Sequence, residues 1–210
     1  MKIAVLGASG WIGSNLAREV QERGHQLVAL VREPSKVSLN AEVRQVDSQD
    51  RSALLQALAD IEVLIVSIGG RASGAHQIVP NTAKTLLNLL PDTSVQRLLW
   101  VGGAGSLEVA PGQTLLSLPS FPEEYKGEAQ AQGEALQVFR TSNSQVDWLF
   151  VSPAAEIFPG QRTGQYRLGG DQLLTDNEGH SRISVEDYAK ALLDEVEAKR
   201  YQRQRIGVAY

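Results

Sequence analysis

The sequence contains no cysteine, which excludes disulfide bonds, thiolate metal sites and cysteine nucleophiles. It also has no apolar run that approaches the ~18 residues needed to span a membrane. The chain begins with a strand-like apolar stretch rather than a basic segment followed by a leader core. We therefore expect a cytoplasmic protein without a secretion signal.

Positive charge is also in short supply, because 20 lysines and arginines face 24 acidic residues, for a net charge of -4. An acidic balance disfavours nucleic acid or an anionic membrane as a partner. The basic run of Lys199, Arg200, Arg203 and Arg205 is more typical of a solvated helix terminus than of a nucleic-acid patch. These observations favour a small-molecule partner and leave the oligomeric state open.

The 210 residues predict a single α/β domain, residues 1–210, with a small substrate-side region near its C-terminus. Short apolar runs alternate with amphipathic stretches, which is typical of a doubly wound parallel sheet covered by helices on both faces. The expected strands are Lys2–Leu6, Leu27–Val31, Val43–Val46, Val63–Ser67, Arg97–Val101, Trp148–Val151 and Arg205–Val208. The expected helices are Trp11–Arg23, Arg51–Leu58, Ala75–Leu90, Glu124–Arg140 and a last one from a capping box at Ser184 to about Arg200.

Two segments rich in glycine, proline and serine, Gly105–Pro122 and Phe158–Gly179, are expected to be loops. They follow strands, and in open α/β sheets ligands bind beyond the carboxyl ends of the strands. Pro153 is expected to stop the strand that precedes the second loop.

The clearest motif is a G-x-x-G-x-x-G pattern between the first strand and the first helix. Gly7 would make the sharp turn, Gly10 would let the backbone approach a pyrophosphate, and Gly13 would let the helix pack on the strand. The remaining cofactor-binding candidates of this motif are Ser9, Trp11 and Ile12. For Trp11, the backbone N–H could bind phosphate, or the ring could simply shield the turn. An ordinary glycine turn is the alternative, but the strand–turn–helix context favours dinucleotide binding.

The second strand ends on Arg32, at the position where a dinucleotide site selects its ribose substituent. A guanidinium can grip a 2′-phosphate with two hydrogen bonds, so Arg32 favours NADP, with Lys36 as a possible second cation. Glu33 is the counter-argument, because a shift of one residue would present a carboxylate to an NAD ribose. Arg32 and Lys36 could also be ordinary solvated charges, so NAD stays possible.

Later strand ends add further cofactor-binding candidates. Asp47 could meet the adenine, or it could cap the helix that follows Ser48. The exits of the fourth and fifth strands supply glycines that would let the backbone approach a ribose or nicotinamide. The candidates at these exits are Ser67, Ile68, Gly69, Gly70, Gly102 and Gly103.

Together these residues resemble a known family, the atypical short-chain dehydrogenases/reductases, and most closely its NmrA-like single-domain branch. The resemblance extends over nearly the whole chain and is carried by the motifs Gly7–Gly13, Val31-Arg32, Val101–Ser106 and Ser184–Ala189. Members of this branch are often described as NADH-flavin reductases, and biliverdin-IXβ/flavin reductases are more distantly similar. The resemblance implies a Rossmann-like fold and places Pro153 and Ala154 at the nicotinamide end.

The chain departs from the wider family at its usual proton donor, a Tyr-x-x-x-Lys pair on the helix after the fifth strand. Here Tyr125 is followed four residues later by Ala129, and Lys126 by Gln130. Tyr125 and Lys126 could line the pocket, although an exposed position at the helix start fits them better. Reduction of a carbonyl needs a proton for the alkoxide, whereas a flavin or quinone delocalises the arriving electron pair. The sequence therefore predicts an NAD(P)H-dependent reductase of a flavin, quinone or similar flat acceptor, with catalytic residues unknown.

Two alternatives to this prediction stay open. One is a cofactor-sensing regulatory protein that binds NADP(H) without turnover. The other is a nucleotide-sugar epimerase, for which the chain is short and lacks the tyrosine pair. His25, His76 and His180 lack ligand spacing, so we predict no metal site and place each histidine in a loop or on the surface.

Overall fold

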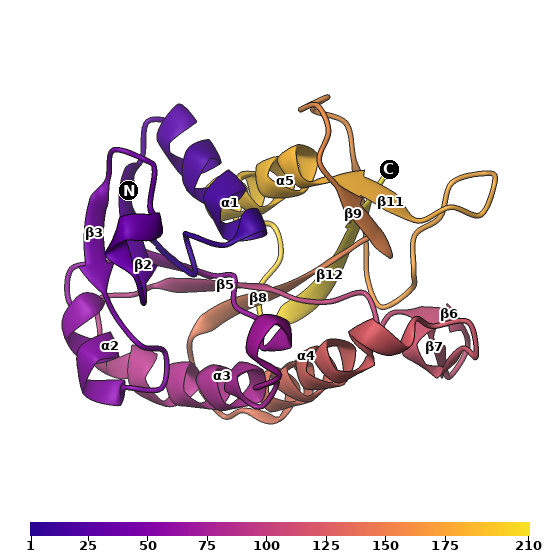
Figure 1. Ribbon diagram of the computed structural model, residues 1–210, viewed down its shortest axis with the longest axis horizontal. Helices are drawn as coiled ribbons and strands as arrows, with labels where there is room; N and C mark the ends of the chain where they lie inside the picture. Colours follow the sequence, from indigo (N-terminus) through magenta and orange to yellow (C-terminus); the bar gives the residue numbers. More distant parts are fainter.

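The computed structural model describes all 210 residues. Its main sheet has eight strands and lies between two layers of helices (Figure 1). The order across the sheet is β10-β12-β8-β5-β4-β1-β2-β3, and every neighbouring pair is parallel except β10 and β12. The strands are β1 (Lys2–Leu6), β2 (Gln26–Val31), β3 (Glu42–Gln45), β4 (Val63–Val66), β5 (Arg97–Val101), β8 (Asp147–Pro153), β10 (Arg167–Gly169) and β12 (Gln204–Ala209). This Rossmann-like architecture confirms the predicted fold class.

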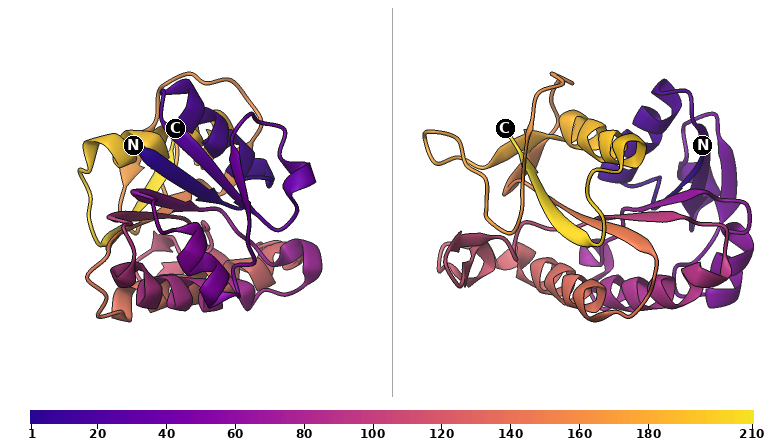
Figure 2. Two further views of the ribbon diagram at one scale, coloured as in Figure 1. Left: turned by 90° about the vertical axis from the view of Figure 1, so that its left-hand side faces the viewer. Right: turned by 180° about the vertical axis from the view of Figure 1, so that it is seen from behind.

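The helices divide between the two faces of the sheet (Figure 2). They are α1 (Trp11–Glu22), α2 (Arg51–Ala57), α3 (Ile78–Leu89), α4 (Glu123–Thr141) and α5 (Val185–Ala198). Helices α1 and α5 cover one face, and α2, α3 and α4 cover the other. Alternate residues of a strand serve the two layers: Trp100 packs towards α4, and its neighbour Leu99 packs towards α5. Because both faces are buried, the central strands are mostly apolar, with Arg97 of β5 and Ser152 of β8 as buried exceptions.

Three short strands lie within the two segments that the sequence predicts to be loops, and that prediction is wrong for them. They are β6 (Glu108–Ala110) and β7 (Gln113–Thr114), which form a hairpin, and β10, which extends the main sheet. A further pair, β9 (Glu156–Phe158) and β11 (Arg182–Ser184), forms a separate small parallel sheet. Strands of two or three residues are too short to show an alternating pattern, so the sequence gives no signal for them.

Two predicted boundaries also need correction. Strand β8 runs through Pro153 instead of stopping before it, because pairing with β5 ends at Val151 and the missing proline N–H breaks no ladder bond on that side. Helix α3 begins at Ile78 rather than Ala75, since the preceding residues form tight turns with bonds such as Ile78 N–H to the Ala75 carbonyl (3.1 Å). No helix is both long and apolar enough to cross a bilayer.

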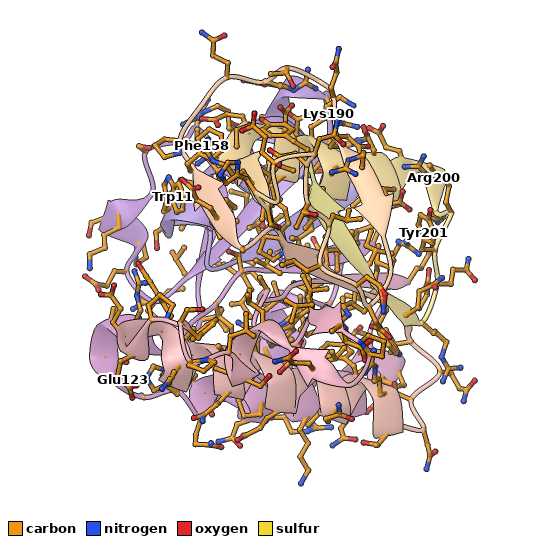
Figure 3. The ribbon with its side chains drawn as sticks, turned by 90° about the vertical axis from the view of Figure 1, so that its right-hand side faces the viewer. Trp11, Glu123, Phe158, Lys190, Arg200 and Tyr201 are labelled. Atoms are coloured by element: carbon orange, nitrogen blue, oxygen red, sulfur yellow. The ribbon has the colours of Figure 1, made fainter.

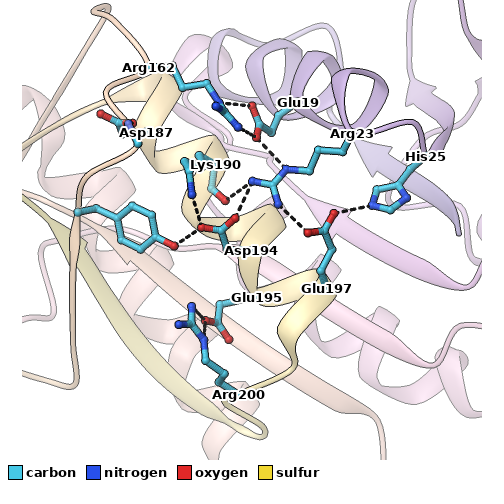
Figure 4. Close-up of polar contacts among 12 residues, drawn as sticks. Glu19, Arg23, His25, Arg162, Asp187, Lys190, Asp194, Glu195, Glu197 and Arg200 are labelled. Carbon is cyan, nitrogen blue, oxygen red and sulfur yellow. Dashed lines mark hydrogen bonds and ion pairs between the residues drawn. The ribbon is translucent and has the colours of Figure 1, made fainter.

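A charged network joins α1, α5 and the long segment that follows β9 (Figure 4). Arg23 donates to Glu19 (2.8 Å), Asp194 (2.7 Å) and Glu197 (2.9 Å), and Arg162 donates to Glu19 from the other side (2.7 Å). Glu19 is buried, and burial alone would raise its pKa, but the hydrogen bonds from Arg162 and Arg23 hold that pKa below its ordinary value. The network therefore fixes the segment around Arg162 against the α1–α5 layer.

Candidate functional site

The first glycine turn leaves β1 at the carboxyl edge of the sheet, between β2 and β4. Gly7 has φ of +88°, and a Cβ atom there would lie 2.1 Å from the Ser67 carbonyl oxygen. A Cβ atom at position 13 would lie 2.1 Å from the Gly7 carbonyl oxygen, so α1 packs directly on the turn. Ile12 is half-buried and packs against the core beneath α1 and α5. The turn and packing roles predicted for Gly7 and Gly13 agree with this geometry.

The N-terminus of α1 carries no capping side chain. Gly10 is its N-cap residue, and the first turn contains no acidic residue. By contrast, Asp50 caps α2 through a bond from the Ala53 N–H (3.0 Å), and Ser184 caps α5. Ser9, Gly10 and Trp11 are exposed here, with Trp11 at 48%. Free N–H groups at the positive end of a helix dipole suit a phosphate, so this end of α1 fits the pyrophosphate of a dinucleotide.

Arg32 follows β2 directly and is exposed, and its guanidinium makes no hydrogen bond or ion pair within the protein. Glu33 is instead paired with Lys36 at 2.7 Å, and this hydrogen bond from Lys36 lowers the pKa of Glu33. Of the three charged side chains considered from the sequence, Arg32 therefore has its donors free, whereas Glu33 and Lys36 engage each other.

Asp47 lies just beyond β3 and is exposed. Its carboxylate accepts the Gln49 N–H at 2.9 Å and so closes a local turn. The alternative prediction, that Asp47 caps the following helix, is wrong, because α2 starts later and Asp50 is its cap. Asp47 thus stays available at the carboxyl edge of the sheet for the predicted contact with the adenine.

The exit of β4 is crowded by a side chain from α4. Ser67 and Ile68 are half-buried, and the two glycines that follow have little room around them. A Cβ atom on Gly69 would lie 2.9 Å from Glu128 Oε1, and one on Gly70 would lie 2.5 Å from the Ala75 carbonyl oxygen. These glycines therefore make room for Glu128 and for the turn before α3.

The glycines after β5 make room for packing in a similar way. A Cβ atom on Gly102 would lie 2.1 Å from Phe150 Cε1, and one on Gly103 would lie 3.3 Å from Gln132 Cβ. Pro153 and Ala154 are both buried at the end of β8. These four residues do gather at the carboxyl edge of the sheet, but packing alone accounts for the two glycines.

Two helix starts flank this edge from opposite sides of the sheet (Figure 3). Trp11 and Phe158 belong to the layer of α1 and α5, whereas Glu123 belongs to the layer of α3 and α4. Tyr125, close to the start of α4, is 41% exposed, and the Arg71 guanidinium lies 4.9 Å from the centre of its ring. Lys126 pairs with Glu123 at 2.6 Å. Both positions match the expected exposed helix start.

The structure adds two polar residues that the sequence analysis did not select for the site. Glu128 on α4 accepts the Gly70 N–H at 2.9 Å, and its Oε2 lies 3.1 Å from Nδ1 of His76. His76 lies in a loop, as expected, but it is tied to the exit of β4 and to α4 rather than to remote surface. The i, i+4 spacing of Glu128 and Gln132 on α4 is the signal that could have indicated this polar face.

The late motif around Ser184 is structural. Asp187 is buried and accepts hydrogen bonds from the Thr163 hydroxyl (2.6 Å), the Gly164 N–H (2.7 Å) and the Tyr210 hydroxyl (2.8 Å). Burial alone would raise the pKa of Asp187, but these hydrogen bonds hold it below the ordinary value. Tyr188 is fully buried, donates to the Val151 carbonyl at 2.7 Å, and has a pKa raised by burial.

Two cavities open away from this edge. One of about 600 Å³ lies between the C-terminal parts of α3 and α4, beside Leu87 and Val138. Another of about 310 Å³ lies beside Arg140, Asp171 and Arg205. Neither is lined by a residue predicted to bind the cofactor.

Comparison with known proteins places this geometry in a family. A family model described as NAD(P)H-binding matches residues 7–198, from the first glycine of the turn to the last residue of α5. The chain belongs to the NAD(P)H-binding family. This membership is consistent with the resemblance to atypical short-chain dehydrogenases/reductases and makes NAD(P)H the cofactor class of the family.

Several similar proteins match this chain over nearly its whole length. A Burkholderia pseudomallei structure, of a protein proposed to be exported, is 42% identical with a TM-score of 0.90, and the match covers 100% of both chains. The uncharacterized protein YwnB of Bacillus subtilis is 38% identical over 99% of this chain and 98% of its own. A Streptococcus pneumoniae structure, of a protein proposed to be an NADH-flavin reductase, is 34% identical with a TM-score of 0.88, covering 100% of this chain and 99% of the other.

Proposed function

We propose that this NAD(P)H-binding protein is a reductase that passes a hydride to a flavin, a quinone or a similar flat acceptor. The observation that carries the proposal is the uncapped, glycine-bounded start of α1, combined with an α4 that lacks the tyrosine–lysine pair. The first feature suits a dinucleotide phosphate, and the second disfavours carbonyl reduction. The name given to the Streptococcus pneumoniae relative supports the same class of acceptor.

The phosphates would lie on the backbone N–H groups of Trp11 and Ile12 at the start of α1, since the Gly10 N–H already donates to the Gly7 carbonyl at 3.0 Å. Arg32 would grip a 2′-phosphate, which favours NADP over NAD, and Asp47 would face the adenine. The bound nicotinamide would supply the hydride. The residues at the exits of β4, β5 and β8, among them Gly70, would set where the acceptor lies.

The absence of the tyrosine–lysine pair on α4 also supports a second function, that of a cofactor sensor. A protein that binds NADP(H) without turnover, and signals its cofactor state to a partner, needs the phosphate site but no proton donor. The two functions differ in one observable. A reductase oxidises NADPH when an acceptor is present, whereas a sensor binds NADPH and leaves it unchanged.

The test is a screen of the purified protein with NADPH against flavins, quinones and carbonyl compounds, followed by the loss of nicotinamide absorbance. Turnover with a flavin or quinone supports the reductase, and turnover restricted to carbonyl compounds contradicts it.

The cellular location of the protein stays a prediction. The sequence favours the cytoplasm, and fractionation of the native organism is the test, since the Burkholderia pseudomallei relative is proposed to be exported.

A further inference from the structure

The His76–Glu128 pair is held in one arrangement by contacts from several elements. Glu128 Oε2 lies 3.1 Å from His76 Nδ1 and 2.9 Å from the Gly70 nitrogen, so one carboxylate oxygen binds both the ring and the backbone. The side chains are 31% and 21% exposed, respectively. The imidazole is therefore oriented by a carboxylate and still open to solvent or a ligand.

The carboxylate is itself supported from the core. Gln132, one turn further along α4, places its Nε2 3.4 Å from Glu128 Oε1. Its own Oε1 accepts the indole N–H of Trp100 at 3.0 Å, and Trp100 is fully buried in the centre of the sheet. A chain of polar contacts thus runs from a fixed indole through an amide and a carboxylate to the imidazole. Such a chain restricts the orientation of its last member.

Two glycines leave the space that this pair occupies. A Cβ atom on Gly69 would lie 2.9 Å from Glu128 Oε1, and one on Gly127 would lie 2.7 Å from His76 Nε2. The imidazole edge therefore lies directly against the backbone of α4, where any larger residue would displace it. Nε2 makes no hydrogen bond within the protein, although of the ring atoms it lies nearest to the Cβ position of Gly127.

The place of the pair matters for chemistry. It lies where β4 ends and α4 passes over that exit, the region that the proposed function gives to the acceptor. On this helix the family's usual tyrosine and lysine stand four residues apart, and here Glu128 and Gln132 have that spacing. An imidazole oriented through Nδ1 by a carboxylate can donate a proton through Nε2.

We propose that His76 is the proton donor to the acceptor and that Glu128 is the residue that positions it. This inference rests on the proposed reductase function and deepens it. The acceptor gains a hydride, with both electrons, from the reduced nicotinamide, and it gains one proton on an oxygen or nitrogen from His76. The imidazole then regains a proton from water. Quinones and flavins can also take this proton from water, so His76 would accelerate their reduction rather than make it possible.

The first test is steady-state NADPH oxidation by the full chain, with an acceptor that the wild-type protein reduces. His76→Ala should lower kcat by about a hundredfold or more, the usual size of general acid catalysis, without weakening NADPH binding. Free imidazole should restore much of the lost rate, since it can enter the vacated space. Glu128→Gln should lower kcat in the same direction, less severely, and should not respond to imidazole.

His25→Ala is the matched control, because His25 pairs with Glu197 at 3.0 Å and lies at the amino end of β2. It should keep the wild-type rate. A wild-type rate in His76→Ala, or a loss that imidazole does not repair, would overturn the inference while leaving the reductase intact. No turnover by the wild-type protein with any acceptor would remove the proposed function itself, and this inference with it.

A second test does not depend on turnover. Diethyl pyrocarbonate modifies exposed imidazole rings, and mass spectrometry locates the modified histidine. An oxidised flavin or quinone added with NADP⁺ should protect His76 and leave the reactivity of His180, an exposed histidine before β11, unchanged. Equal modification of His76 with and without the acceptor would place the acceptor elsewhere and contradict the assignment.

Discussion

Gly13 packs so closely on Gly7 that a methyl group at position 13 would lie 2.1 Å from the Gly7 carbonyl oxygen and 2.8 Å from its carbonyl carbon. Gly7 is itself pressed against the Ser67 carbonyl and has a positive φ. The start of α1, the exit of β1 and the exit of β4 are therefore fixed relative to one another by glycine alone. No side chain caps the first turn of α1.

This packing predicts the effect of Gly13→Ala. The added methyl group must push α1 away from the turn, which we expect to destabilise the protein by about 1–3 kcal/mol and to weaken NADPH binding. Urea unfolding and a fluorescence titration with NADPH measure the two effects. Gly170→Ala is the matched control, because nothing lies within 4 Å of a Cβ atom there. Equal behaviour of the two variants would show that α1 tolerates a shift at the turn.

Arg32→Ala should weaken NADPH binding by about tenfold to a hundredfold, roughly 1.5–3 kcal/mol, because a charge-assisted grip on the 2′-phosphate is lost. NADH binding should stay nearly unchanged, since NADH has no such phosphate. Parallel titrations with both cofactors measure the difference, and Lys84→Ala, an exposed lysine on α3, controls for the lost charge. Equal weakening of both cofactors, or tighter binding of NADH by the parent protein, would contradict a role for Arg32 in the choice.

Tyr125→Phe and Lys126→Ala should each lower the rate only modestly. The Tyr125 ring is exposed against Arg71, and the Lys126 amine is paired with Glu123, so neither is arranged to deliver a proton. Steady-state NADPH oxidation measures the effect. A fall of about a hundredfold to ten-thousandfold in Tyr125→Phe, with NADPH binding intact, would identify this tyrosine as the acid and restore carbonyl reduction as the better mechanism.

Asp187 should contribute stability that depends on pH. Its pKa is held below the ordinary value of 3.8 in the folded protein, so the unfolded chain binds the proton more readily. The contribution is complete above the unfolded pKa, and it is lost as the pH falls through the lower, folded pKa. Asp187→Asn should cost about 1–3 kcal/mol at neutral pH, because the Thr163, Gly164 and Tyr210 donors lose a charged acceptor.

Urea unfolding at neutral pH and on both sides of pH 3.8 measures this effect. The difference between the parent protein and Asp187→Asn should shrink in acid. Glu178→Gln, at an exposed carboxylate, should show no such convergence. If the difference in the free energy of unfolding were the same at every pH, the effect of Asp187 would come from packing and neutral hydrogen bonds rather than from its charge.

The sequence was sufficient for the layered fold because the relevant signals are long and periodic. The strand Arg97–Val101 has the predicted bounds, and Ser184 does cap α5 by accepting the Asp187 N–H, although the reciprocal bond of a capping box is replaced by one from the Ser184 N–H to Tyr210. Strand β10 could not be predicted, because Arg167–Gly169 has three residues and gains its stability from pairing with β12 at the sheet edge. The 3.1 Å bond between the Ile78 N–H and the Ala75 carbonyl, which delays the start of α3, likewise depends on the folded surroundings.

The phosphate end of the site could be predicted from local sequence, because Gly7, Gly10 and Gly13 act within one turn. The acceptor end could not. Glu128 and His76 are separated by 52 residues and meet only because α4 crosses the exit of β4. Gly102 illustrates a different difficulty, because one residue can be explained in two ways. Its motif predicts an approach of the backbone to the cofactor, but the contact with Phe150 already requires a glycine there.

Hydride transfer from bound NADPH to a flat acceptor should show a kinetic isotope effect. Rapid mixing of the protein, loaded with NADPH deuterated at the transferred position of the nicotinamide, with a quinone or flavin measures the rate of that single step. NADPH should be oxidised within the complex, and more slowly when the cofactor is deuterated. Stable NADPH in the complex, with every acceptor left oxidised, would contradict hydride transfer and favour the sensor.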